Sequence, residues 1–153
     1  MSDLTKQFFE ALSKMSGDKM KFSPIFMEEM GVEVLEHLEG KSVKISIPIR
    51  AVYNNPLGIT FGGYYGVFFD TAFGLFSSLA AKVLTTTLDL NICFIKPLSL
   101  KDERVLGEAK EVSLSKNYLL LSSEARKSSG ELVATATSRL LLMDVSRMKL
   151  PTS

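Results

Sequence analysis

The stretch TFGGYYGVFFDTAFG, residues 60–74, decides the fold of this chain. Two glycines open an almost wholly apolar run that holds a single carboxylate, Asp70. Residues 62–83 together predict a long helix that is apolar nearly all round, which is typical of a helix wrapped by other structure. An unpaired carboxylate buried in such a helix is costly or takes up a proton, so the retention of Asp70 needs a reason.

Two shorter helices are predicted ahead of this segment. Residues 3–15 place apolar side chains at helical spacing, and residues 23–31, SPIFMEEMG, predict a second, shorter helix. The expected start and stop signals are Ser2 or Asp3 and Ser23 as caps, Pro24 in the first turn of the second helix, and Gly31 as its end.

Alternating apolar and polar residues predict strands on both sides of the long helix. Residues 43–49 alternate in this way, and Pro48 suits a strand's end or a sheet edge. YNNPLG, residues 53–58, is a turn. Four strands are predicted after the helix, antiparallel and in sequential order, at 87–95, 105–114, 118–126 and 131–143, with hairpin turns at 115–117 and 127–130.

This order of elements predicts an α+β fold in which an antiparallel sheet curls round the long helix. The 153 residues are expected to form a single domain, with a helical segment at 1–31 and the core at 32–146. A curled sheet has exposed edges, and pairing one edge with a second copy of the chain is one way to cover them.

Composition excludes several classes of protein. The hydrophobic content of 46% and charged content of 23% are those of a folded domain, and a net charge of +1 gives no reason to expect a nucleic-acid partner. One cysteine permits no internal disulfide, and neither a secretory signal nor a membrane-spanning run is evident. We therefore expect a cytoplasmic protein with no membrane partner.

The usual catalytic and metal-binding motifs are absent. With one histidine, His37, and one cysteine, Cys93, a single chain cannot build a Cys/His zinc site, so no metal is expected. We interpret His37 as a surface or strand-end residue and Cys93 as a packed structural thiol. The sequence has no G-x-S-x-G, P-loop or GxGxxG motif.

Asp70 and the glycines remain as the candidate chemistry. Gly62 and Gly63 fall where the long helix begins, and its free N–H groups suit a carbonyl oxygen that becomes an oxyanion. Asp70 lies about 10 Å further along the helix, too far to attack that carbonyl. If Asp70 is catalytic, the enzyme is expected to be at least a dimer with composite sites. Two such helices lying antiparallel across a two-fold axis would bring the Asp70 of one to the glycines of the other. Alternatively, Asp70 bonds a neighbouring hydroxyl such as Tyr65 or Thr71, and the glycines serve close packing.

The pattern resembles the hotdog-fold acyl-CoA thioesterases, with the phenylacetate-pathway (PaaI-like) branch as the nearest group. The resemblance rests on an N-x5-F-G-G-x6-D block and extends over about residues 53–98. GELVATATS at 130–138 is similar to a common closing strand of this group. The block consists of Asn55, Phe61, Gly62, Gly63 and Asp70, followed by TLDLNICFIKP at 87–97.

The resemblance implies a role for each matching residue. Asp70 is the expected general base or nucleophile, and Thr87 positions the attacking water. The Gly62 N–H polarises the thioester carbonyl with help from the Asn55 side chain. Asp70 and Thr87 come from one subunit, while Asn55 and Gly62 come from the other, which agrees with the spacing argument.

Phe61 departs from the family pattern, in which a histidine usually precedes the two glycines. This replacement removes a polar group from the expected pocket. From the change in polarity we expect a preference for longer or more apolar acyl groups. Phe61 and Gly63 are expected to contact the substrate.

The expected partners are an acyl-CoA substrate and further copies of the chain, as a homodimer or dimer of dimers. Coenzyme A enters only as part of the substrate, and no other cofactor is expected. Its phosphates need basic or N–H partners, and the unassigned candidates are Lys96, Lys101, Arg104, Lys116 and Arg126.

Three other functions stay open. A non-catalytic acyl-CoA or fatty-acyl binding protein would use the same pocket, and Phe61 favours it. A hydratase of the same fold needs a D-x4-H pattern, but Leu75 stands at that offset from Asp70. A purely structural dimerisation domain is the third alternative.

Overall fold

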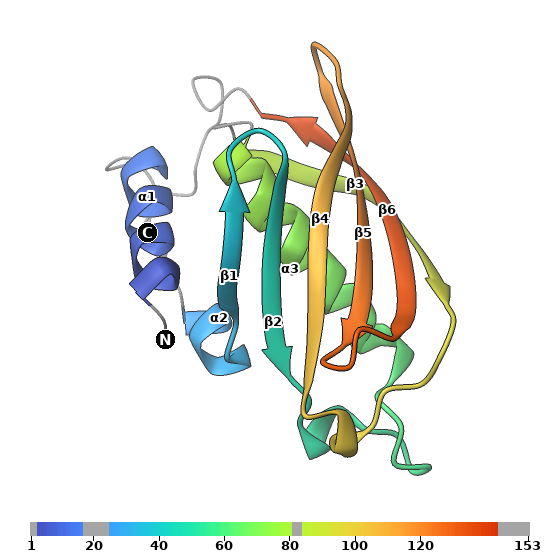
Figure 1. The fold of residues 1–153 in the computed structure, drawn as a ribbon. Helices are drawn as coiled ribbons and strands as arrows, with labels where there is room; N and C mark the ends of the chain where they lie inside the picture. Colours follow the sequence, from blue (N-terminus) through green and yellow to red (C-terminus); the bar gives the residue numbers. More distant parts are fainter. Residues whose placement is uncertain (1–2, 17–24, 81–83, 144–153) are drawn as a thin grey trace, which may run out of the picture.

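The computed structural model describes residues 3–16, 25–80 and 84–143. One antiparallel sheet of six strands curves round a long helix, α3 (Gly62–Ala80), as Figure 1 shows. The predicted α+β hotdog architecture is therefore confirmed. The strands are β1 (Glu33–Leu38), β2 (Ser42–Pro48), β3 (Thr85–Phe94), β4 (Arg104–Leu114), β5 (Tyr118–Lys127) and β6 (Leu132–Leu142).

The two predicted short helices are present as α1 (Asp3–Ser16) and α2 (Ile25–Met30). Gly31, at φ 68°, ends α2 in the left-handed conformation that glycine adopts easily. The proposed caps Ser2 and Ser23, Pro24, and the last three residues predicted for the long helix, 81–83, lie outside the described residues.

The strand and turn predictions are confirmed, with one strand missed. Pro48 is the last residue of β2, which lies between β1 and β4, so it marks a strand's end and not an edge. β1 was not predicted because a register shift between Val34 and Glu36 interrupts its alternation.

The prediction that the last four strands pair in sequential order is wrong for β3. The sheet order is β1-β2-β4-β5-β6-β3, so β3 pairs with β6 at one edge and the hairpins β4–β5 and β5–β6 fill the middle. The connection from β3 to β4, residues 95–103, contains a short 3₁₀ helix, η3 (Leu100–Asp102), instead of a tight turn. This longer connection crosses from one edge of the sheet to its middle (Figure 1).

The core lies between α3 and the inner face of the sheet. Phe68, Phe69, Phe73 and Phe76 of α3 are fully buried against apolar side chains of the central strands. The closest approach is at Gly107 of β4, where an added Cβ would stand 2.3 Å from Phe68 Cζ. A glycine is required there, because any side chain would collide with the buried ring.

The two edges of the sheet differ in whether another element covers them. α1 lies beside β1, and Thr5 Oγ1, fully buried, accepts a hydrogen bond of 2.9 Å from the Val34 N–H. At the other edge, β3 runs for ten residues with no further strand beyond it in the described chain. Among the described residues, one edge of the sheet is therefore covered and the other is open.

Candidate active site

Asp70 lies on the one face of α3 that the sheet does not cover. The side chain is exposed, and Thr87 Oγ1 donates a hydrogen bond of 2.7 Å to Asp70 Oδ1. Thr87 stands on β3 directly before a register shift between Thr87 and Asp89, a bulge that leaves Leu88 without a partner on β6. Helix and edge strand thus bring two of the predicted site residues into contact.

The expectation that α3 is wrapped all round is wrong at this face. Asp70 is solvated in the single chain, so it avoids the cost of a buried charge. The alternative partners proposed for it bond elsewhere: Thr71 Oγ1 donates to the Val67 carbonyl at 2.8 Å, and the Tyr65 hydroxyl donates to the Lys96 carbonyl at 3.4 Å. Its hydrogen-bond partner is the threonine of the edge strand.

The N-terminus of α3 offers two free backbone donors. Gly62 and Gly63 are exposed, and within the described part of the chain neither N–H group has a hydrogen-bond acceptor. Phe61 precedes the helix, and its side chain cannot accept the hydrogen bond that a capping Ser or Asp would accept. These donors sit at the positive end of the helix dipole and can polarise a carbonyl oxygen.

Asn55 shapes the turn that leads into this helix. Its Oδ1 accepts hydrogen bonds from the N–H groups of Leu57 at 2.9 Å and Ile59 at 3.2 Å. Gly58, at φ 74°, closes the turn through a 2.9 Å hydrogen bond to the Asn55 carbonyl. Because Oδ1 is engaged in this way, only the side-chain Nδ2 of Asn55 is left to donate to a substrate.

Within one chain the two halves of the candidate site do not meet. Asp70 follows Gly62 by eight residues, which is about 12 Å along the helix axis. Apolar side chains are exposed between and beside them, including Val67 on α3 and Leu88 and Phe94 on β3. Of the ten residues of β3 only Asp89 is charged, and it is paired with Arg139 of β6. An open, nearly uncharged edge of this kind suits pairing with another strand.

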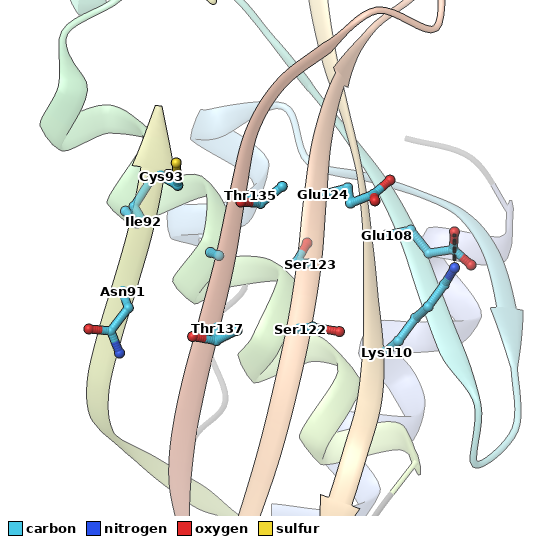
Figure 2. Close-up of a pocket in the computed structure, with 11 residues that line it drawn as sticks. Asn91, Ile92, Cys93, Glu108, Lys110, Ser122, Ser123, Glu124, Thr135 and Thr137 are labelled. Atoms are coloured by element: carbon cyan, nitrogen blue, oxygen red, sulfur yellow. Dashed lines mark ion pairs between the residues drawn. The ribbon is translucent and has the colours of Figure 1, made fainter. Parts of the chain in front are cut away.

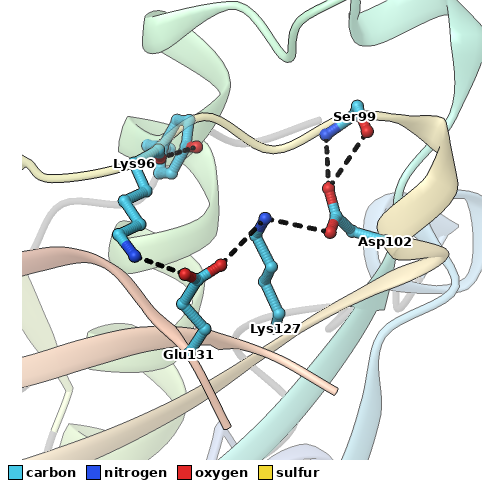
Figure 3. Close-up of polar contacts among 6 residues, drawn as sticks. Lys96, Ser99, Asp102, Lys127 and Glu131 are labelled. Carbon is cyan, nitrogen blue, oxygen red and sulfur yellow. Dashed lines mark hydrogen bonds and ion pairs between the residues drawn. The ribbon is translucent and has the colours of Figure 1, made fainter. Parts of the chain in front are cut away.

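A polar network fixes the β3–β4 connection beside the helix N-terminus (Figure 3). Lys127 bridges Asp102 at 3.2 Å and Glu131 at 3.1 Å, and Glu131 also pairs with Lys96. Burial alone would raise the pKa of Asp102, but hydrogen bonds from the Ser99 backbone and Lys127 outweigh it and lower that pKa. The hydrogen bond with Lys96, foremost, lowers the pKa of Glu131, so the carboxylates of this network stay ionised at neutral pH.

The basic residues considered for coenzyme A divide into two groups. Three of them make ion pairs: Lys96 with Glu131, Arg104 with Glu33 and Arg126 with Glu124. Lys101 and Lys116 are exposed and make no ion pair with any residue that the structure describes.

A shallow hollow of about 440 Å³ lies on the outer face of the sheet, away from α3 (Figure 2). Small polar side chains of β3, β5 and β6 line it, with the Lys110–Glu108 ion pair at its side. Cys93 lines it and is exposed, so the interpretation of Cys93 as a packed thiol is wrong for the single chain. None of the predicted site residues borders this hollow.

His37 lies within β1 and is half-buried, and no residue that the structure describes forms a hydrogen bond with its Nε2. Within the described ranges, no group of three or more His, Cys, Asp or Glu side chains is placed to hold a metal ion. None of the helices that the structure describes is both long and apolar enough to cross a membrane.

Comparisons with known proteins show which family this chain resembles. The model of the thioesterase superfamily matches residues 57–134, just over half of the chain. A candidate esterase of Archaeoglobus fulgidus is 27% identical over 119 residues, which cover 78% of this chain and 75% of that protein.

Solved structures agree with this match. A variant of the phenylacetic acid degradation protein PaaI of Thermus thermophilus is 27% identical, with a TM-score of 0.69 over 78% of this chain and 99% of its own. A thioesterase of Haemophilus influenzae has a TM-score of 0.74 at 19% identity, covering 93% and 94% of the two chains, which shows a shared fold. The chain belongs to the thioesterase superfamily, and its relatives support thioester hydrolysis in general.

Proposed function

We propose that this chain hydrolyses an acyl-CoA thioester to a free carboxylic acid and coenzyme A, in a site shared between two subunits. The observation that carries the proposal is the Asp70–Thr87 hydrogen bond of 2.7 Å on an exposed and otherwise apolar face. A carboxylate held by a hydroxyl, beside a surface that a second copy would cover, suits a base acting at a subunit boundary.

The proposed geometry follows from the separation along α3. Two antiparallel helices related by a two-fold axis bring Asp70 of one chain to Gly62 of the other. The Gly62 N–H then binds the thioester oxygen, and the Asn55 amide is placed to assist. The open edge of β3 offers the pairing that would join the two chains into one sheet.

The reaction needs few groups. Asp70 takes a proton from a water that Thr87 orients, and the water oxygen adds to the thioester carbon. Negative charge develops on the carbonyl oxygen, where the helix N–H groups stabilise it. The intermediate collapses with cleavage of the C–S bond, and the coenzyme A thiolate takes up a proton. Direct attack by Asp70, through an anhydride that water then cleaves, uses the same groups.

The test is thiol release from a panel of acyl-CoAs by the wild type, Asp70→Asn and Thr87→Val. We expect Asp70→Asn to lower kcat by about 10²-fold or more, because proton transfer by a positioned base typically contributes that much. Thr87→Val removes the hydroxyl but keeps the shape, and we expect a smaller loss. Thr86→Val, at the neighbouring exposed threonine of β3, is the matched control and should keep wild-type kcat.

Full activity in Asp70→Asn would overturn the role of Asp70. A wild type that binds acyl-CoA but releases no thiol would favour the alternative, a non-catalytic acyl-CoA binding protein. The apolar Phe61 at the head of α3 is the observation that favours this alternative, because no general acid or base stands there.

A further inference from the structure

A second side-chain hydrogen bond joins α3 to β3, near the one between Asp70 and Thr87. Ser77 Oγ and Thr85 Oγ1 lie 2.7 Å apart, and the Ser77 side chain is fully buried. Ser77 Oγ also donates to the Gly74 carbonyl at 3.0 Å. Because a serine hydroxyl has one proton to donate, Thr85 is the donor in the bond between the two hydroxyls.

The two hydrogen bonds lie on the same face of the helix and on the same face of the strand. Ser77 follows Asp70 by seven residues, which is about two helical turns, so both side chains leave α3 on one face. Thr85 precedes Thr87 by two residues, so both hydroxyls leave β3 on one face, about 7 Å apart along the strand. In each pair a threonine of β3 donates to a side chain of α3.

The bulge at Leu88 separates Thr87 from the rest of β3. Residues 85–87 pair with β6 in one register, and pairing resumes at Asp89 in a shifted one. Beyond the bulge the strand is fixed, because the Asp89 carboxylate accepts hydrogen bonds from the backbone N–H and the guanidinium of Arg139. A bulge disrupts the ladder locally, so these contacts hold the strand after Leu88 more firmly than the part before it. That earlier part has its own attachment to α3 through its first residue.

We propose that Ser77 and Thr85 are positioning residues, whose hydrogen bond keeps the Thr87 hydroxyl within bonding distance of the Asp70 carboxylate. Without this bond the first residues of β3 can move away from α3. A hydroxyl that orients a water molecule must be held closely, because a displacement of about 1 Å can lower a rate greatly. The inference rests on the proposed function, because it assigns residues that support the same site.

The first test measures kcat and KM for thiol release from the acyl-CoA that the wild type turns over fastest. Thr85→Val removes the donor and keeps the shape of the side chain. We expect kcat to fall about fivefold, the factor that corresponds to one net hydrogen bond, with KM unchanged. Ser77→Ala should lose a similar factor, and Thr85→Ser, which retains a hydroxyl, should recover most of the rate.

Ser78→Ala is the matched control. Ser78 Oγ donates to the same Gly74 carbonyl at 2.9 Å, and it makes no hydrogen bond to β3 within the part of the chain that the structure describes. The variant therefore loses a serine–carbonyl bond of the same kind without loosening the strand, and it should keep the wild-type kcat.

Combination with Thr87→Val tests whether the effect is transmitted through Thr87. If Thr85 acts through Thr87, adding Thr85→Val to Thr87→Val causes no further fall in kcat. Losses that multiply would overturn the proposal, because a general loosening of the fold lowers the rate whether or not the Thr87 hydroxyl is present.

A measurement on the free protein separates this inference from the proposed function. NMR relaxation of the threonine methyl groups gives an order parameter for the Thr87 side chain without any substrate. We expect this order parameter to fall in Thr85→Val and Ser77→Ala and to keep its wild-type value in Ser78→Ala. Thr85 is only partly buried, so Thr85→Val carries the test alone if Ser77→Ala does not fold.

The two proposals can then fail separately. A lower order parameter supports the positioning role even if the wild type releases no thiol from any acyl-CoA. An unchanged order parameter in Thr85→Val overturns the positioning role, even if Asp70→Asn abolishes thiol release.

Discussion

Asp70 and Thr87 show how one irregularity in a strand prepares a reactive group. The bulge after Thr87 inserts Leu88 without a partner and shifts the register of β3 against β6. Bulges of this kind re-aim neighbouring side chains, and here the Thr87 hydroxyl meets the carboxylate of α3. Because that carboxylate is exposed, it carries none of the desolvation cost of a buried charge in the single chain.

The donor role of Gly62 can be tested at this scale by a pair of substitutions. Gly62 is the first residue of α3, the position at which proline is tolerated in a helix. Gly62→Pro keeps the helix but removes the N–H, and we expect kcat to fall by about 10²-fold, as for the loss of one oxyanion donor. The measurement is steady-state thiol release at saturating acyl-CoA.

Gly62→Ala is the control for this substitution. It retains the N–H, and its Cβ would meet Phe94 Cζ at 3.4 Å, an ordinary contact. Equal losses in the alanine and proline variants would show that crowding, and not the missing donor, reduces the rate.

At the scale of elements, the contrast between the two sheet edges organises the molecule. α1 covers β1 and supplies the Thr5 hydroxyl to its backbone, whereas no described strand pairs with the outer edge of β3 next to Asp70 and Thr87. An exposed strand edge can pair with a strand of another chain. Because α1 covers the β1 edge, only the β3 edge is available for such pairing among the described strands. The open edge and the reactive pair therefore belong to the same surface.

The contribution of α1 can be measured through its buried hydroxyl. Thr5→Val leaves the Val34 N–H without this acceptor, and we expect the free energy of unfolding to fall by about 1–3 kcal/mol. Urea denaturation followed by circular dichroism measures the change. Thr5→Ser keeps the hydroxyl and should lose clearly less stability; equal stability of Thr5→Val and the wild type would show that this hydrogen bond does not hold α1 in place.

Periodicity in the sequence was enough to predict α3, β2 and the two hairpins, because local spacing determines which residues face a core. The pairing of β3 with β6 was not predicted, since it depends on a crossing connection that local patterns do not encode. The exposure of Asp70 and Cys93 was missed for the same reason. A residue on an apolar segment is buried only if another element reaches it, and the sequence does not say which face stays uncovered.

At the scale of the whole molecule, a shared site predicts complementation between inactive variants. In mixed dimers of Asp70→Asn with Gly62→Pro, one site carries both changes and the other carries neither. Half of the dimers formed at random from equal amounts are mixed, so we expect about a quarter of wild-type activity. Thiol release by the co-refolded mixture, compared with each variant refolded alone, measures it.

The controls for complementation use the same proteins. Mixing without unfolding should give no recovery until subunits exchange, which shows that recovery requires a shared site. If both groups act within one chain, the co-refolded mixture will be no more active than the average of the two variants.

The contact between Gly107 and Phe68 has a consequence for how this protein can evolve. With the helix seated directly on the backbone of β4, α3 cannot slide or tilt without breaking the core, so the frame behind the site is fixed. Exposed residues at the head of α3, such as Phe61, lie outside this packing, so substitutions there leave the buried core unchanged. We therefore expect substitutions at such exposed positions to change substrate preference under the proposed function while the stability of the scaffold is kept.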